Sequence, residues 1–436
     1  MRALAWPVSQ ADALVHASAL LLPAAGSAVL LPALDAAYQV SSAASGSTDF
    51  ALLLAFLLSK RACLYASAGA AVAVSALRSR SAEPRTGARL KSLTAEIFGS
   101  EAAASLEALE GRDTVQVLDS LDESPALAQA VALPLILSLL LLGSFALLPN
   151  EDPGAATGAG SMLAEGADVL RAVASGIAPL SNAALCLVFC RAEAAALLSA
   201  ATSTPDESEG ASLATAEPRP EVAAAATAVA AVATAAAFGL PSAVAWPVQN
   251  VVSICIAISV SRLLALGRLL PIMLVLAALA AYDVVFAGGV ASATMAQTVD
   301  PSAASTTAEA QSVMESVARS RLSGTWQPGL IQVRVGARLT DGLGLGDIVF
   351  PSLLAGWAAR FDRRAGAALL PAVLGGYAVG CVLLEVAPRA VSPAALSCFV
   401  PATLTAVMLR LAATGATEDA FGWDGAPTQS IGPGKE

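Results

Sequence analysis

Long apolar stretches separated by polar breaks dominate the hydrophobic pattern of the chain. Several of them are long enough and poor enough in charge for a helix to cross the hydrocarbon core of a bilayer. The pattern predicts nine membrane-spanning helices. Their expected ranges are 62–77, 126–148, 167–190, 221–240, 246–263, 269–291, 342–359, 366–387 and 393–413.

The polar segments divide the chain into four parts. Residues 1–60 are an N-terminal extension, a signal sequence or an additional helix, because an apolar run there is followed by small residues. Residues 61–245 hold helices one to four, and residues 246–413 hold helices five to nine. The polar segment 292–341 predicts a long loop between the sixth and seventh helices. Residues 414–436 are polar and contain Gly and Pro, which predicts a disordered cytosolic tail.

The composition agrees with a membrane protein. The chain is 56% hydrophobic and 13% charged, whereas soluble domains carry about 25% charged residues. The sequence therefore predicts an all-α polytopic membrane protein that lies in a lipid bilayer. A net charge of -10 argues against a nucleic-acid partner. The single histidine, His16, leaves no His-based metal site and no Ser-His-Asp triad. The oligomeric state stays open, a homo-oligomer included.

Basic residues follow alternate predicted spans and so indicate the orientation. Arg78 follows the first span, Arg191 the third and Arg360 the seventh. Because cytosolic loops carry the excess of Lys and Arg, the N-terminus of span one is expected outside and the C-terminal tail in the cytosol. The arginines of the 292–341 segment depart from this pattern.

Two aspartates interrupt otherwise apolar stretches: Asp283 in the sixth predicted span and Asp347 in the seventh. A carboxylate in hydrocarbon is costly, so such an acid is a candidate functional residue. Neighbouring antiparallel helices place both residues at a similar depth in the outer half of the membrane. Facing carboxyl groups cannot both be ionised comfortably and should share a proton. This arrangement provides an acid and a base side by side, as in an aspartic protease.

The residues next to the two aspartates agree with a reactive site. Gly344 and Gly346 remove side chains beside Asp347, so that a substrate strand can approach, and they would loosen a helix there. In the fifth predicted span, Gln249 and Asn250 are expected to form hydrogen bonds between helices, with a substrate contact as the alternative.

These sequences resemble a known family. Tyr282-Asp283 and Gly344-Leu345-Gly346-Asp347 resemble the paired signatures of the signal peptide peptidase and presenilin group of intramembrane aspartyl proteases. The continuation from Asp347 to Pro351 resembles the signal-peptide-peptidase branch more closely. The resemblance implies that Asp283 and Asp347 are catalytic. It implies a membrane-spanning peptide substrate, such as a signal peptide or type II anchor, no metal or organic cofactor, and a location in the endoplasmic reticulum or another endomembrane.

The last predicted span departs from the family pattern. The family carries a Pro-Ala-Leu sequence beside the active site, whereas this chain reads Pro393-Ala394-Ala395-Leu396, with the proline one position earlier. The resemblance implies that this segment contacts the substrate.

Two other functions remain open from the sequence. A secondary transporter could use the two aspartates to relay protons or bind a cation, although the sequence shows no inverted repeat. A protease homologue without activity could retain or escort membrane proteins, and the displaced proline motivates this alternative.

Overall fold

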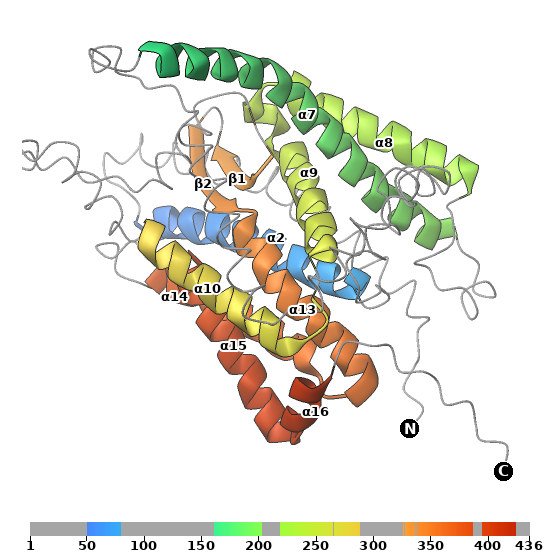
Figure 1. Ribbon diagram of the computed structural model, residues 1–436, viewed down its shortest axis with the longest axis vertical. Helices are drawn as coiled ribbons and strands as arrows, with labels where there is room; N and C mark the ends of the chain where they lie inside the picture. Colours follow the sequence, from blue (N-terminus) through green and yellow to red (C-terminus); the bar gives the residue numbers. More distant parts are fainter. Residues whose placement is uncertain are drawn as a thin grey trace, which may run out of the picture.

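The computed structural model describes residues 50–79, 161–202, 219–264, 266–287, 326, 328–335, 338–386 and 395–423. These residues form nine helices and one β-hairpin (Figure 1). The helices are α2 (Phe50–Ser79), α7 (Ser161–Thr202), α8 (Pro220–Gly239), α9 (Ser242–Leu263), α10 (Leu269–Ala287), α13 (Gly346–Ala365), α14 (Leu369–Val386), α15 (Ala395–Thr414) and α16 (Thr417–Gly422). The strands are β1 (Leu330–Val335) and β2 (Arg338–Gly344).

Six of the described helices are long and apolar enough to cross a membrane. The stretches are Arg61–Ser79, Leu180–Ser199, Pro220–Gly239, Ser242–Arg262, Leu369–Val386 and Ala395–Thr414. Helix α10 is apolar over Leu269–Val284, and α13 ends in a charged segment that contains Arg360, Asp362 and two further arginines. The predicted span at 126–148 lies outside the described residues, so the count of nine spans stays a prediction.

The third predicted span, 167–190, lies within α7, but the helix continues beyond its predicted end to Thr202. Leu180–Ser199 is a stretch of this helix that could cross a membrane. Arg191 and Glu193 suggest the end of an apolar run, but both lie inside the helix. The Glu193 side chain is buried against positive charge from two other helices. Because those charges offset the cost of burial, the helix continues past it.

The seventh predicted span, 342–359, is wrong at its start. Residues 342–344 end β2, and the helix begins at Gly346 and continues to Ala365. The two strands pair antiparallel, with Gln332 opposite Gly342. The predicted loop 292–341 therefore contains most of a hairpin, and the all-α prediction fails at this place. The alternating Gly-Leu-Gly-Leu sequence fits a strand with one buried face as well as a helix.

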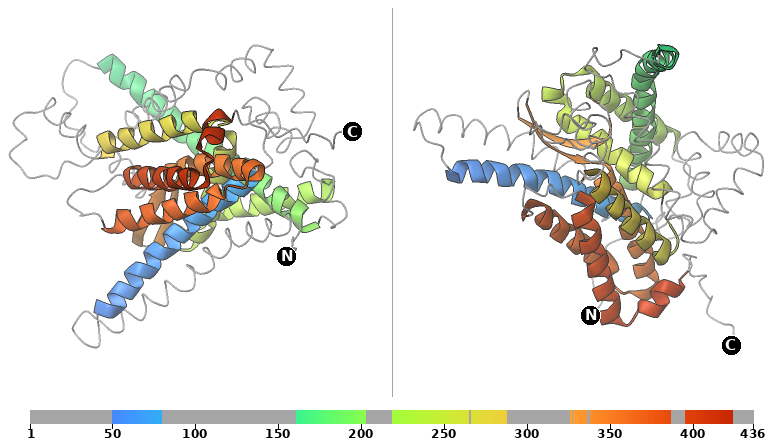
Figure 2. Two further views of the ribbon diagram at one scale, coloured as in Figure 1. Left: turned by 90° about the horizontal axis from the view of Figure 1, so that it is seen from below. Right: turned by 60° about the vertical axis from the view of Figure 1, so that its left-hand side comes forward.

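Helix α13 lies at the centre of the described structure. It contacts α2, α9, α10, α14 and α15, and residues 348–361 are buried except for Phe350. Helices α7 and α8 pack side by side at the opposite end of the molecule from α14 and α15 (Figures 1 and 2). The helix that carries Asp347 is therefore held on several sides by other helices.

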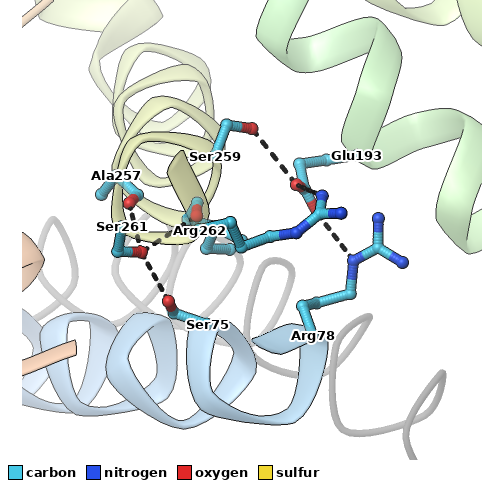
Figure 3. Close-up of polar contacts among 8 residues, drawn as sticks. Ser75, Arg78, Glu193, Ala257, Ser259, Ser261 and Arg262 are labelled. Atoms are coloured by element: carbon cyan, nitrogen blue, oxygen red, sulfur yellow. Dashed lines mark hydrogen bonds and ion pairs between the residues drawn. The ribbon is translucent and has the colours of Figure 1, made fainter. Parts of the chain in front are cut away.

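A buried carboxylate joins α2, α7 and α9. Glu193 of α7 is fully buried, and its oxygens lie 3.7 Å from Arg78 Nε of α2 and 3.6 Å from Arg262 Nη1 of α9 (Figure 3). The Ser259 hydroxyl donates a hydrogen bond of 3.2 Å to the same carboxylate. Close by, the Ser75 and Ser261 hydroxyls form a hydrogen bond between α2 and α9.

The C-terminal tail begins later than predicted. Residues 417–422 form α16, and Trp423 is buried beside Trp357 and Phe361 of α13. The ring centroid of Trp423 lies 6.0 Å from that of Trp357 and 5.6 Å from that of Phe361. Burial of a large aromatic side chain stabilises this part of the predicted disordered segment. Residues 424–436 lie outside the described residues.

The Glu193 cluster should contribute much more to stability than an exposed ion pair. We expect Glu193→Ala to lower the free energy of unfolding by about 3 kcal/mol, because it leaves two partly buried arginines without this carboxylate. The matched control is Glu385→Ala, since Glu385 pairs with Arg61 where both side chains are more than a third exposed. That change should cost about 1 kcal/mol or less. Thermal unfolding in detergent compares the two, and equal losses would contradict the expectation.

Candidate active site

Asp283 lies near the end of α10 and faces the start of α15. It is 7% exposed, and its Oδ2 accepts a hydrogen bond of 3.0 Å from the Leu396 amide. Leu396 is the second residue of α15, so its N–H has no partner within the helix. The positive end of the helix dipole also lies at this carboxylate. The start of α15 thus stabilises negative charge on Asp283.

Asp347 lies at the start of another helix. It is the second residue of α13, directly after the turn that follows β2. The backbone amide of Gly344 interacts with its carboxylate. A Cβ at residue 344 would lie 3.3 Å from Asp347 Oδ2, so a side chain there would crowd the carboxylate. The sequence suggested that Gly344 loosens a helix, but in the structure it ends a strand.

The turn before Asp347 is fixed by the hairpin. The Leu345 amide donates a hydrogen bond of 3.0 Å to the Gly329 carbonyl, just before β1. A Cβ at Gly346 would lie 3.2 Å from the ring of Phe350, which is a side chain that can shift. Of the two glycines, Gly344 is therefore the one whose lack of a side chain bears on the carboxylate.

The packing of α10 brings the two aspartates together. Helix α10 contacts both α13 and α15, and the charges of the Asp283 and Asp347 carboxyl groups interact with each other. Tyr282 is partly exposed on α10. Ala395 and Leu396 open α15, whereas Pro393 and Ala394 lie outside the described residues.

Helix α14 connects the surroundings of the two carboxylates. A Cβ at Gly376 would lie 2.7 Å from Thr403 Cα, and one at Gly380 would lie 2.8 Å from Phe399 Cα. The backbones of α14 and α15 therefore touch, as in membrane helices paired through small residues. Between the two glycines, Tyr377 packs its ring 4.9 Å from that of Phe399 and directs its hydroxyl to the Asp347 carbonyl at 3.4 Å.

This support was not predicted from the sequence. The signal for it is the Gly376-xxx-Gly380 spacing in an apolar span, which marks a close helix contact. The contacts of Glu193 were not predicted either, and their signal is an acid inside an apolar run that could cross a membrane. Within the described ranges, no group of three or more His, Cys, Asp and Glu side chains is placed to hold a metal ion.

The glycine contact gives a test of how closely α15 must approach. We expect Gly376→Ala to lower the free energy of unfolding by about 2 kcal/mol, because the new methyl group overlaps the α15 backbone. It should also move the Leu396 amide away from Asp283. Gly375→Ala is the matched control, since a Cβ there has no atom within 4 Å. Thermal unfolding in detergent compares the stability of the two variants, and equal stability would contradict this account.

Comparison with known proteins identifies the family. The family model described as signal peptide peptidase matches residues 128–419, which is more than half of the chain and includes both aspartates. Comparisons with curated proteins and with solved structures gave no match. The chain is a multi-pass membrane protein that belongs to the signal peptide peptidase family, the intramembrane aspartyl proteases that cleave transmembrane segments.

Proposed function

We propose that Asp283 and Asp347 are the two catalytic carboxyl groups of this protease. The observation that carries the proposal is their placement. Two acids from apolar helices interact with each other, and each has a backbone amide near the start of a helix as a partner. Such a pair can hold one proton between two carboxyl groups, which aspartyl proteolysis requires.

The proposed mechanism follows from that shared proton. The ionised carboxylate accepts a proton from a water molecule, and that water attacks the scissile carbonyl carbon. The protonated carboxyl group donates a hydrogen bond to the carbonyl oxygen and stabilises the charge that develops there. The amine then leaves with a proton from the dyad, so the two groups exchange their roles. Their ionisation belongs to the pair rather than to either residue alone.

The hairpin offers a place for the substrate. A transmembrane helix hides its carbonyl groups, so the substrate must unwind before it can be cleaved. In the described part of the chain the sheet consists of β1 and β2, and β2 ends three residues before Asp347. An unwound substrate can pair with the outer edge of β2 as an added strand, with its backbone groups satisfied by hydrogen bonds. This pairing would lead the scissile bond towards Asp347.

The start of α15 forms the other side of the proposed site. Ala395 and Leu396 lie beside Asp283 through the Leu396 amide, and we extend this substrate-facing segment back to Pro393 and Ala394. A proline removes a backbone donor before the helix begins. Because the proline lies one position earlier than in the family, the segment from the proline to Leu396 is one residue longer.

The substrates we propose are signal peptides and type II membrane anchors, in the endoplasmic reticulum or another endomembrane. Membership of a protease family favours this function over the transporter alternative. The inactive-homologue alternative is tested directly by the activity of the two aspartates.

Both aspartates should be essential. We expect Asp283→Ala and Asp347→Ala each to abolish cleavage of a labelled single-span peptide in detergent, and the double variant to be no worse, because the two residues act as one unit. Asp419→Ala is the control, since Asp419 is exposed on α16. Near-normal turnover by either single variant would exclude the dyad. An inactive wild-type protein that binds an aspartyl-protease inhibitor poorly would support the inactive homologue.

The orientation also belongs to the proposal. We propose nine spans, with the N-terminus of span one outside and the C-terminal tail in the cytosol, as the arginine distribution predicts. The dyad then lies in the outer half of the membrane.

Glycosylation in microsomes tests this orientation. An acceptor site inserted within 292–325 should be modified, and one inserted within 424–436 should not. The second position lies beyond Trp423, which is buried, so the insertion should leave α16 in place. The reverse modification pattern would invert the proposed topology.

A further inference from the structure

A side chain of α9 occupies the outer edge of β1. Asn250 is 8% exposed. Its Nδ2 donates a hydrogen bond of 2.7 Å to the Gln332 carbonyl, and its Oδ1 accepts one of 2.8 Å from the Gln332 amide. A residue of a neighbouring β-strand would exchange the same two bonds with Gln332. The Asn250 carboxamide therefore stands where a third strand would pair.

Neighbouring contacts extend this blocked edge. The Ser253 hydroxyl, one turn along α9, donates to the Leu330 carbonyl at 3.1 Å. The Gln332 side chain is itself buried and donates to Gln249 Oε1. Gln249 in turn donates to the Ala237 carbonyl of α8 at 2.9 Å. The sequence predicted hydrogen bonds between helices for Gln249 and Asn250. Gln249 does reach α8, but Asn250 bonds to a strand.

The position of this contact gives it a consequence for the active site. Gln332 pairs with Gly342 of β2, and the strand register is irregular just beyond it, between Val333 and Arg334. Gly342 lies five residues before Asp347 in the sequence. The Asn250 contact is thus one of the bonds that fix the hairpin to α9, and it lies immediately before the irregular pairing. Loss of this contact would weaken the hold of α9 on β1 at that place.

We infer that Asn250 is a positioning residue that sets the register of β2 against the two aspartates, and through it selects which substrate peptide bond is cut. This inference rests on the proposed function of β2 as the edge that receives the substrate. Side chains alternate between the two faces of a strand. A slip of the β2 register that keeps each side chain on its original face therefore moves the pairing by two residues. The cleavage position should therefore shift in steps of two.

The position of the cut tests this role. We expect Asn250→Ala to lower total cleavage of a labelled single-span peptide about tenfold, through misplacement of the reacting bond. Mass spectrometry of the products should show new cuts two residues from the main one. Ser253→Ala removes one bond at the same edge and should give a smaller share of shifted products. It also provides the test if Asn250→Ala does not fold.

The matched control is Ser259→Ala. Ser259 is a buried serine of the same helix, but its hydroxyl bonds to Glu193 and not to the hairpin. This variant should lose stability and still cut at the wild-type position. A merely structural role of Asn250 would likewise lower activity without moving the cut, so unshifted products from Asn250→Ala and Ser253→Ala would overturn the inference.

Hydrogen exchange separates this inference from the proposed catalytic function. We combine Asn250→Ala with Asp347→Ala and measure amide exchange in residues 330–335. The exchange rate should rise about tenfold relative to Asp347→Ala alone, because a buried hydrogen bond is lost. It should not rise in Ser259→Ala. Unchanged exchange would refute the role of Asn250 even if the protease is active. Raised exchange together with an inactive wild type would refute the protease function and the role in selecting the cut.

Discussion

A carboxylate inside an apolar helical bundle needs hydrogen-bond donors or positive charge beside it, because neither hydrocarbon nor apolar side chains can solvate it. Much of the arrangement of this protein follows from that need. Glu193 draws α2 and α9 to α7 through Arg78 and Arg262. Asp283 lies against the start of α15, and Asp347 at the start of its own helix. Asp362 accepts hydrogen bonds from the amides of Leu369 and Leu370 and so joins α13 to α14.

These acids differ in their partners. Glu193 lies beside two guanidinium groups, and Asp362 accepts two amide hydrogen bonds of 2.6 Å and 2.8 Å. Asp283 and Asp347 lie on two helices that contact each other, Asp283 beside the start of α15 and Asp347 at the start of α13. The same constraint therefore yields two acids that join helices and two that we propose for proton transfer.

The aspartates were predictable from the sequence because a charge in an apolar run stands out wherever the helix ends fall. The start of α13 was not, because Gly342-Leu-Gly-Leu fits two periodicities, and only the pairing with β1, the preceding strand of the hairpin, decides between them. The continuation of the third helix beyond residue 190 was not predicted, for a related reason. Whether Glu193 ends a helix depends on arginines that lie far away in the sequence, on α2 and α9. The role of Leu396 was suggested by the family resemblance, yet its contact with Asp283 depends on how closely α14 and α15 approach.

The strand before Asp347 links the fold to the chemistry. If α13 began two turns earlier, Asp347 would lie inside the helix, and the Gly344 amide would be paired within that helix and not available to its carboxylate. The chain must therefore arrive at Asp347 in a non-helical conformation. Non-helical backbone at membrane depth is tolerated only where protein or water satisfies its polar groups. Here the pairing of β1 with β2 satisfies the groups between the two strands, and Asn250 satisfies those of Gln332 at the outer edge of β1. In the proposed function, an unwound substrate would find backbone hydrogen-bond partners at the outer edge of β2, beside the proposed catalytic carboxylate of Asp347.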